Sequence, residues 1–189
     1  MKDENIKQLV EQTLEKHSKI DILVNNAAMD MATISCSFMD AGFLNKYDNA
    51  LRLELDVPIK ICRLTMPYLI ESKGSIINVS SVAAKRPVNE GMLHSVCKAA
   101  IEAMTKCLAL EFGPKGVRVN TVNPGFVRTP QTEPYLEDPH SLKQAKSYSV
   151  FHQVGEAEEI AFAVAFLASN ASNFVTGTNL LVDGGFLLK

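Results

Sequence analysis

Residues 75–122 read SIINVSSVAAKRPVNEGMLHSVCKAAIEAMTKCLALEFGPKGVRVNTV, and this stretch decides the fold. Its two ends, residues 75–79 and 117–122, are short runs rich in Val and Ile, which predict buried β-strands. Between them, residues 93–112 place apolar side chains at helical spacing, and the turn residues Gly113 and Pro114 end that helix. A strand, a helix and a second strand in this order predict a βαβ unit with parallel strands.

The same alternation continues on both sides of this unit. We expect further helices at residues 2–16, 46–71 and 156–169, and further strands at residues 20–25 and 179–182. Pro58 lies inside the second of these helices and lacks an amide donor, so a kink or break is expected near Val57. The whole pattern predicts an α/β fold in which helices cover both faces of a parallel sheet.

Two connecting segments carry no clear periodicity. A loop is expected from the end of the first strand through Gly42. The polar stretch 128–153 is also predicted to be irregular, and it is the best candidate for a mobile lid or substrate loop.

Composition excludes several classes of protein. Of 189 residues, 47% are hydrophobic and 21% are charged, which argues for a folded globular chain of one domain, residues 1–189. The formal net charge is −2 and no Lys/Arg block occurs, so we expect no nucleic-acid or anionic-membrane partner. The polar N-terminus predicts a cytoplasmic address. The uncharged segment 160–182 is interrupted by Ser, Thr and Asn residues, so it is not predicted to span a membrane.

The cysteines do not suggest a metal centre. They are Cys36, Cys62, Cys97 and Cys107. They form no Cys-x-x-Cys pair, and no His lies at zinc-ligand spacing from any of them. We expect reduced cysteines that mostly pack, and no metal site.

Four blocks of sequence carry a resemblance to a known family. They are residues 21–28 (DILVNNAA), 74–81 (GSIINVSS), 116–125 (GVRVNTVNPG) and 175–185 (VTGTNLLVDGG). In this order and at this spacing they resemble the short-chain dehydrogenase/reductase family, in the branch that includes bacterial 3-oxoacyl-carrier-protein reductases. The resemblance covers essentially the whole chain.

The resemblance implies a doubly wound, Rossmann-like sheet that binds NAD or NADP across the carboxyl ends of its strands. Family members begin with a strand, a glycine-rich turn and a helix, whereas this sequence holds no Gly-x-x-x-Gly-x-Gly. We therefore expect the first βαβαβ part of the fold to be lacking. The choice between NAD and NADP rests on residues of that part.

The family transfers hydride between nicotinamide and a carbonyl or alcohol carbon, using a Tyr-x-x-x-Lys pair and a Ser. Ser81 and Lys98 match the Ser and the Lys, but His94 stands in the Tyr position. Imidazole can act as an acid or base near neutral pH. It reaches less far than a phenol, however, and a cation beside Lys98 is disfavoured, so we expect activity to be lost or severely reduced. The simpler interpretation, which we favour, is a tolerated, partly buried polar residue.

Glu54 stands where the family has a fourth catalytic residue, an Asn. A carboxylate at that depth needs a partner, and Lys98 is the candidate. The alternative, that Glu54 faces water, is equally open.

The resemblance also implies a cofactor site. Its residues would be Asn25, Asn26, Ala27, Lys98, Pro124, Gly125, Val127 and Thr129. Asn25 would tie strands together beneath the cofactor, and the Pro-Gly turn would lie against the nicotinamide.

Two hypotheses follow from these patterns. The first is an NAD(P)-dependent oxidoreductase acting on a small carbonyl, alcohol or 3-oxoacyl substrate. The second is an inactive relative that binds or regulates, or a truncated gene product. Strand 20–25 would be an edge in this chain, and helices 46–71 and 93–112 resemble the family's dimer interface, so a homo-oligomer or a hetero-oligomer with a complete homologue is expected.

Overall fold

The computed structural model describes residues 3–189. Four parallel strands form one sheet in the order β1-β2-β3-β6. They are β1 (Ile22–Asn25), β2 (Ser75–Val79), β3 (Arg118–Pro124) and β6 (Asn179–Val182). Every predicted strand is therefore present, and the α/β parallel sheet is confirmed.

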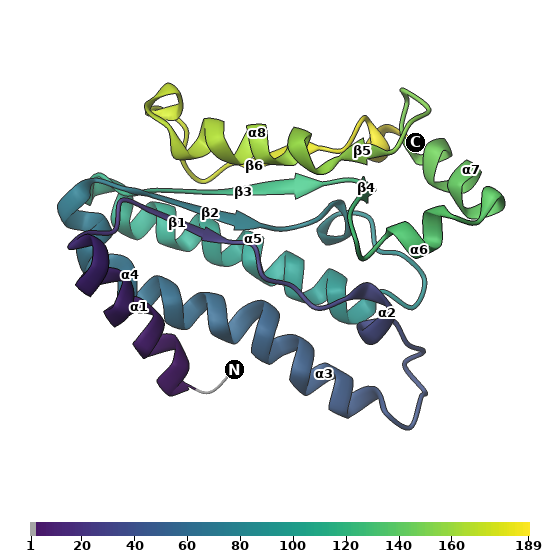
Figure 1. Ribbon diagram of the computed structural model, residues 1–189, viewed down its shortest axis with the longest axis horizontal. Helices are drawn as coiled ribbons and strands as arrows, with labels where there is room; N and C mark the ends of the chain where they lie inside the picture. The colour runs from purple at the N-terminus through teal and green to yellow at the C-terminus, as the bar shows by residue number, and fades with distance from the viewer. Residues whose placement is uncertain (1–2) are drawn as a thin grey trace.

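Helices cover both faces of the sheet, as predicted (Figure 1). One face carries α1 (Asp3–His17), α3 (Phe43–Leu51), α4 (Val57–Ser72) and α5 (Met92–Phe112), and the other carries α8 (Ala157–Ala168). Alternate strand residues serve the two faces: Ile76 packs with α4 and α5, whereas Ile77 packs with Leu167 of α8. The predicted start of the first helix, at Lys2, lies outside the described residues.

The expected interruption near Val57 is present, and its form is specific. A π-helical turn, η1 (Arg52–Asp56), joins α3 to α4, and Pro58 occupies the first turn of α4. The helical run continues through η1 into α4, where the Val57 amide donates to the Arg52 carbonyl, and Pro58 has no amide hydrogen to continue that pattern. Single π-turns inside helices frequently mark functional sites.

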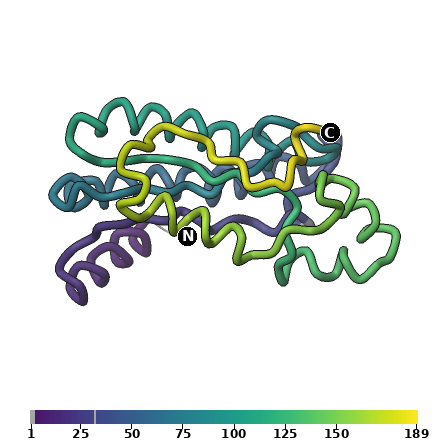
Figure 2. Tube along the Cα trace, turned by 90° about the horizontal axis from the view of Figure 1, so that it is seen from above, coloured from purple at the N-terminus to yellow at the C-terminus, as the bar shows by residue number. Residues whose placement is uncertain are grey.

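The prediction of an irregular stretch at residues 128–153 is wrong. It contains α6 (Glu133–Leu136) and α7 (Pro139–Tyr148), which extend beyond the carboxyl ends of the strands (Figure 2). Asp138 caps α7 by accepting a hydrogen bond from the Ser141 amide, with Pro139 next to it. The short strands β4 (Val127–Arg128) and β5 (Gly155–Glu156) pair with each other at the two ends of this stretch. The loop expected through Gly42 likewise contains a one-turn helix, α2 (Met31–Ile34).

Strand β1 lies at the edge of the described sheet, where it pairs with β2. Its side chains Ile22 and Val24 are 48% and 40% exposed, so one apolar face of this strand is open to solvent. Within residues 3–189, no helix is long and apolar enough to cross a membrane.

Candidate active site

Three of the four residues singled out as catalytic come together at the Glu54 carboxylate, beside the carboxyl end of β2. Glu54 comes from the π-helical turn η1, His94 and Lys98 from successive turns of α5, and Ser81 from the end of β2. Residues four apart share one helix face, which brings His94 and Lys98 to the same carboxylate.

Glu54 is the centre of this group, and its side chain is 0% exposed. Its Oε1 accepts a hydrogen bond from the Met29 amide at 3.0 Å. Its Oε2 lies 3.3 Å from Lys98 Nζ and 3.5 Å from His94 Nδ1. The predicted Glu54–Lys98 pair is confirmed, and the alternative in which Glu54 faces water is wrong.

The environment keeps Glu54 ionised. Burial by itself raises the pKa of the carboxyl, but the His94 imidazole, the Lys98 ammonium and the Met29 amide together outweigh it and lower the pKa below its ordinary value. The same carboxylate and burial raise the pKa of the Cys97 thiol to about 11. Burial thus raises the pKa of both groups, and only at Glu54 do the neighbouring groups outweigh it.

Lys98 is held from two sides. Besides Glu54, its ammonium donates a hydrogen bond to the Val79 carbonyl at 3.2 Å, and its side chain is 6% exposed. The Ser80 hydroxyl donates to the Lys98 carbonyl. These bonds fasten α5 to the end of β2, beside the position of Ser81.

Ser81 has an extended backbone and a half-buried side chain. Its Oγ accepts a hydrogen bond from the Ala83 amide, and its carbonyl accepts one from Asn123 Nδ2 at 3.0 Å. Within residues 3–189 no group accepts a hydrogen bond from the Ser81 hydroxyl, which leaves Ser81 able to donate to a ligand oxygen.

The predicted cofactor residues of β1 divide into two kinds. Asn25 faces inward and donates to Asn78 Oδ1 at 2.7 Å, and Asn78 in turn donates to Thr105 of α5 at 2.8 Å. This agrees with a role in tying strands together. Asn26 and Ala27 follow at the strand end, where both are exposed.

The turn after β3 is closely packed. A Cβ at Gly125 would lie 2.8 Å from Asp183 Cα, so only glycine fits there. Beyond it, the Thr132 hydroxyl donates to the Val127 carbonyl and accepts from the Thr129 amide. Pro124, Gly125, Val127 and Thr129 are half-buried, and so this turn is partly open to a ligand.

A second buried carboxylate, Glu102, was missed from the sequence. Asn123 and Asn179 each donate a short hydrogen bond to it, and Lys85 Nζ lies 3.1 Å from its Oε2. Because Asn123 also donates to the Ser81 carbonyl, Glu102 supports the backbone of Ser81 through Asn123. Its position four residues after Lys98 was the available signal.

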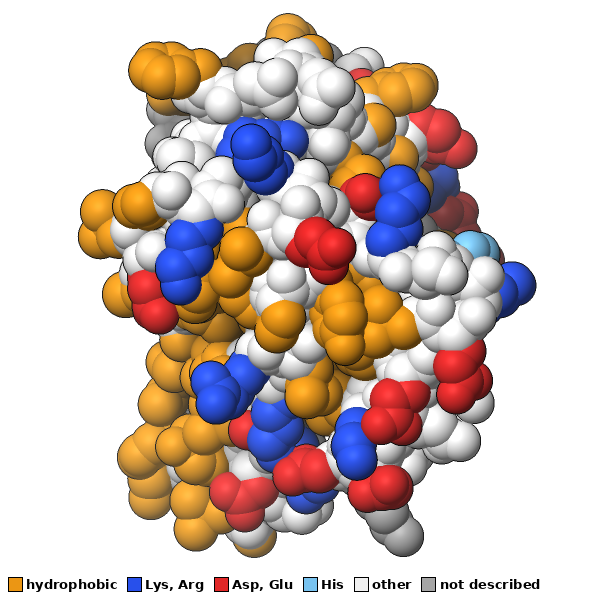
Figure 3. Space-filling view, turned by 90° about the vertical axis from the view of Figure 1, so that its left-hand side faces the viewer, with side chains coloured by type: hydrophobic (Ala, Val, Ile, Leu, Met, Phe, Trp, Pro, Cys, Tyr) orange, Lys and Arg blue, Asp and Glu red, His pale blue; other side chains and the backbone are white. Residues whose placement is uncertain are grey.

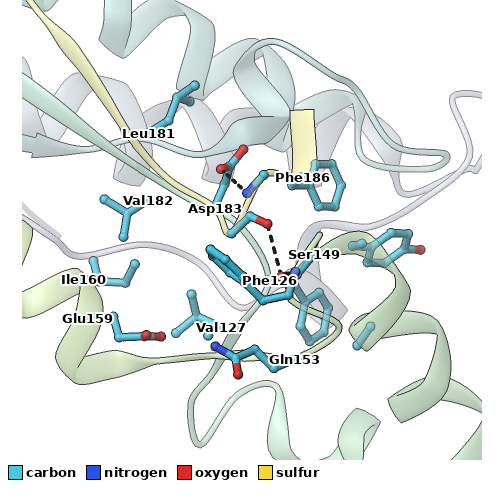
Figure 4. A pocket seen from close by; sticks show the side chains of 16 residues that line it. Phe126, Val127, Ser149, Gln153, Glu159, Ile160, Leu181, Val182, Asp183 and Phe186 are labelled. Carbon is cyan, nitrogen blue, oxygen red and sulfur yellow. Dashed lines mark hydrogen bonds between the residues drawn. The ribbon is translucent and has the colours of Figure 1, made fainter. Parts of the chain in front are cut away.

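A cavity of about 320 Å³ lies near this region, between α7, α8 and the end of β6 (Figure 4). It is lined by aromatic and aliphatic side chains including Phe126, Phe151 and Leu181, and Ser149 crosses it to donate to the Gly184 carbonyl. Val127 is shared with the predicted cofactor residues, whereas Ser81, His94, Lys98 and Glu54 do not line it.

Comparison with known proteins gives the family. A family model described as "Enoyl-(Acyl carrier protein) reductase" matches residues 1–187. A 3-oxoacyl-[acyl-carrier-protein] reductase, FabG, of Thermotoga maritima is 33% identical over 186 residues, which are 98% of this chain and 73% of that protein. The chain belongs to the short-chain dehydrogenase/reductase family. Its branch is the FabG-like one that the sequence blocks indicated.

Other relatives in this family act on sugars, by their names. L-xylulose reductase of Mus musculus is 34% identical over 182 residues, covering 95% of this chain and 73% of its own length. A gluconate 5-dehydrogenase of Burkholderia cenocepacia, solved in complex with NADP and tartrate, aligns with a TM-score of 0.90 at 25% identity, over 100% of this chain and 72% of its own. The short-chain dehydrogenase/reductase fold is therefore shown independently by sequence and by structure.

Proposed function

We propose that this chain is an NAD(P)-linked oxidoreductase of carbonyl and alcohol groups whose turnover is severely reduced or lost. The observation that carries the proposal is the buried Glu54–Lys98 ion pair beside His94. In the family pattern, a lysine serves a neighbouring tyrosine and the cofactor. Here the Lys98 ammonium is committed to Glu54 and to the Val79 carbonyl.

The residues present fit part of an NAD(P) site. The close approach at Gly125, the half-buried Val127 and Thr129, and the exposed Asn26 and Ala27 leave backbone and polar groups open at the strand ends. These would hold the nicotinamide half and the adjoining ribose. Lys98 fits less well, because its side chain is only 6% exposed and is already paired.

The bound cofactor would supply or accept the hydride. Ser81 would hold the substrate oxygen through its hydroxyl, and His94 would stand beside it in place of a phenol. A substrate would be a small ketone or alcohol, with xylulose-like sugars and 3-oxoacyl groups as the first classes to test, because these appear in the names of relatives.

The test compares four proteins: wild type, His94→Tyr, Glu54→Asn and the double variant. NADH and NADPH are titrated by fluorescence and calorimetry, and turnover is followed with xylulose and with an acetoacetyl thioester. We expect the double variant to exceed wild-type turnover by at least about a hundredfold, the lower end of what general acid–base catalysis contributes. Equal turnover in all four proteins contradicts the assignment of reduced activity, and absence of nucleotide binding in all four contradicts the oxidoreductase function.

A second candidate function is an inactive binding or regulatory subunit, for which exposed apolar residues argue. On α3, α4 and α5 they include Leu44 at 72%, Ile59 at 45%, Met92 at 45% and Leu110 at 81% exposure. Figure 3, seen from the end where the strands begin, shows hydrophobic side chains gathered along one edge of the molecule. We propose that this face binds a second copy or a complete homologue in the cytoplasm. Light scattering after size-exclusion chromatography tests it, and a monodisperse monomer contradicts it.

A further inference from the structure

The two positions that depart from the family's catalytic pattern lie against each other. His94 stands for the tyrosine and Glu54 for the asparagine, and His94 Nδ1 is 3.5 Å from Glu54 Oε2. The two residues are forty positions apart in sequence, and the π-helical turn presents one to the other.

Both facing atoms are buried without a hydrogen bond of standard geometry in the part of the chain that the structure describes. The side chain of Glu54 is 0% exposed and that of His94 is 13% exposed, so water does not readily hydrogen-bond to these two atoms. Buried polar atoms are generally paired, and a separation of 3.5 Å closes to a hydrogen bond with a small movement. Oε2 is therefore the partner available to Nδ1, and it is shared with Lys98 Nζ.

The charge of Glu54 decides where the imidazole proton lies. The environment keeps this carboxyl ionised, so a lone pair on Nδ1 would face a negative oxygen. A neutral His94 therefore carries its proton on Nδ1, and the lone pair is on Nε2, the atom away from Glu54. This is the arrangement in which a carboxylate orients a histidine for proton transfer in other enzymes.

Glu54 also removes the objection to a positive imidazole beside Lys98. Without the carboxylate, an imidazolium and an ammonium would place two positive charges in a buried site. With it, Oε2 contacts both groups, at 3.5 Å and 3.3 Å, and the net charge of the three is +1 when His94 is protonated.

We infer that Glu54 is the positioning residue of His94 and that the two act as one coupled acid–base pair, with Nε2 as the atom that exchanges a proton with the substrate oxygen. This inference rests on the proposed function. In the reducing direction, His94 would start as the imidazolium with a proton on each ring nitrogen, a bound cofactor would supply hydride to the carbonyl carbon, and the carbonyl oxygen would take the Nε2 proton. His94 is left neutral with its remaining proton on Nδ1, and oxidation is the exact reverse.

The first experiment needs neither cofactor nor substrate. Long-range 1H–15N spectra of protein labelled with 15N-histidine report which ring nitrogen carries the proton, and a His94→Gln variant identifies the His94 signals. We expect neutral His94 in the Nδ1–H form. A wild-type spectrum with the Nε2–H form overturns the inference.

A matched pair of variants follows. In Glu54→Gln, the side-chain oxygen of the glutamine keeps the hydrogen bond from the Met29 backbone amide, and its NH2 group then faces Nδ1 of His94. A donor in that place favours a lone pair on Nδ1, so we expect the Nδ1–H form to lose its dominance. Glu102→Gln removes the other buried carboxylate, which lies on α5 itself and bonds Asn123 and Asn179, and it should leave the His94 signals unchanged. An unchanged tautomer in Glu54→Gln, or an equal change in Glu102→Gln, contradicts the inference.

A double-mutant cycle measures the coupling directly. Urea unfolding gives the unfolding constants of wild type, Glu54→Gln, His94→Gln and the double variant. The change in the double variant should differ by about tenfold from the product of the changes in the two single variants. Constants that multiply independently contradict the coupled pair. Because none of these readouts uses nucleotide, they fail or succeed separately from the oxidoreductase proposal.

Discussion

Replacing Lys98 with methionine tests how much the buried ion pair matters. Met is similar in length and apolar, so packing is largely kept, but Glu54 loses the ammonium 3.3 Å from its Oε2. The carboxylate side chain is 0% exposed and cannot turn to water. Removing one partner of a buried ion pair typically costs about 3–5 kcal/mol, which is a large part of the roughly 5–15 kcal/mol that stabilises a domain.

Urea denaturation followed by circular dichroism measures this loss. With an m-value of about 2 kcal/mol per M, a loss of about 4 kcal/mol lowers the midpoint by roughly 2 M. The double variant Glu54→Gln/Lys98→Met should recover most of it, because no buried charge is left unpaired. Lys60→Met is the matched control, since its ion pairs with Asp3 and Asp56 are solvent-exposed, and it should change little. A Lys98→Met midpoint equal to that of Lys60→Met would refute the reasoning.

Three further outcomes follow from the same geometry. Gly125→Ala places a Cβ 2.8 Å from backbone of the neighbouring segment, and it should destabilise by about 1–3 kcal/mol in thermal melts, whereas Gly42→Ala, with open space around its Cβ, should be nearly neutral. The pKa of Glu54 is lower in the folded state than in the unfolded state, so the ionised carboxylate stabilises the fold fully above the unfolded pKa of about 4.3, and this stabilisation is lost as the pH falls below that value. Glu54→Gln should therefore flatten the acid side of the curve of unfolding free energy against pH. Parallel curves for wild type and variant would count against the buried pair. Exposed Cys107 should be alkylated by iodoacetamide at pH 8 in the native protein, while Cys62, buried with a pKa raised to about 11, should react only after unfolding, as peptide mass spectrometry would show.

Periodicity was sufficient for most of the fold. A strand with apolar residues on both faces and a helix with one apolar face each leave a distinct pattern in the sequence, which is enough to tell the two apart. The closing strand 179–182 was predicted at its observed bounds. The helix α7 was missed because it is short and polar, and its order comes from the Asp138 cap and from packing of Ala145 against Leu136 and Val154.

The sequence was sufficient to name most residues of the site, but not to say which of them contact each other. Helical spacing places His94 and Lys98 on one face of α5, and this needed no structure. Whether Glu54 met that face or faced water depended on how η1 crosses α5, a long-range contact that local sequence does not encode. Glu102 was missed for the same reason, since its partners Asn123 and Asn179 arrive from distant strands.

The inward ladder from Asn25 through Asn78 to Thr105 has a consequence for how the edge strand is aligned. Asn25 and Asn78 are direct partners in the β1–β2 pairing, and both amides are bonded across it. A slip of β1 that brings Val24 opposite Asn78 would turn Asn25 to the opposite face and leave the buried Asn78 amide oxygen without its donor. The ladder therefore opposes slippage of this edge strand in that direction, because the native alignment is the one that satisfies the Asn78 amide.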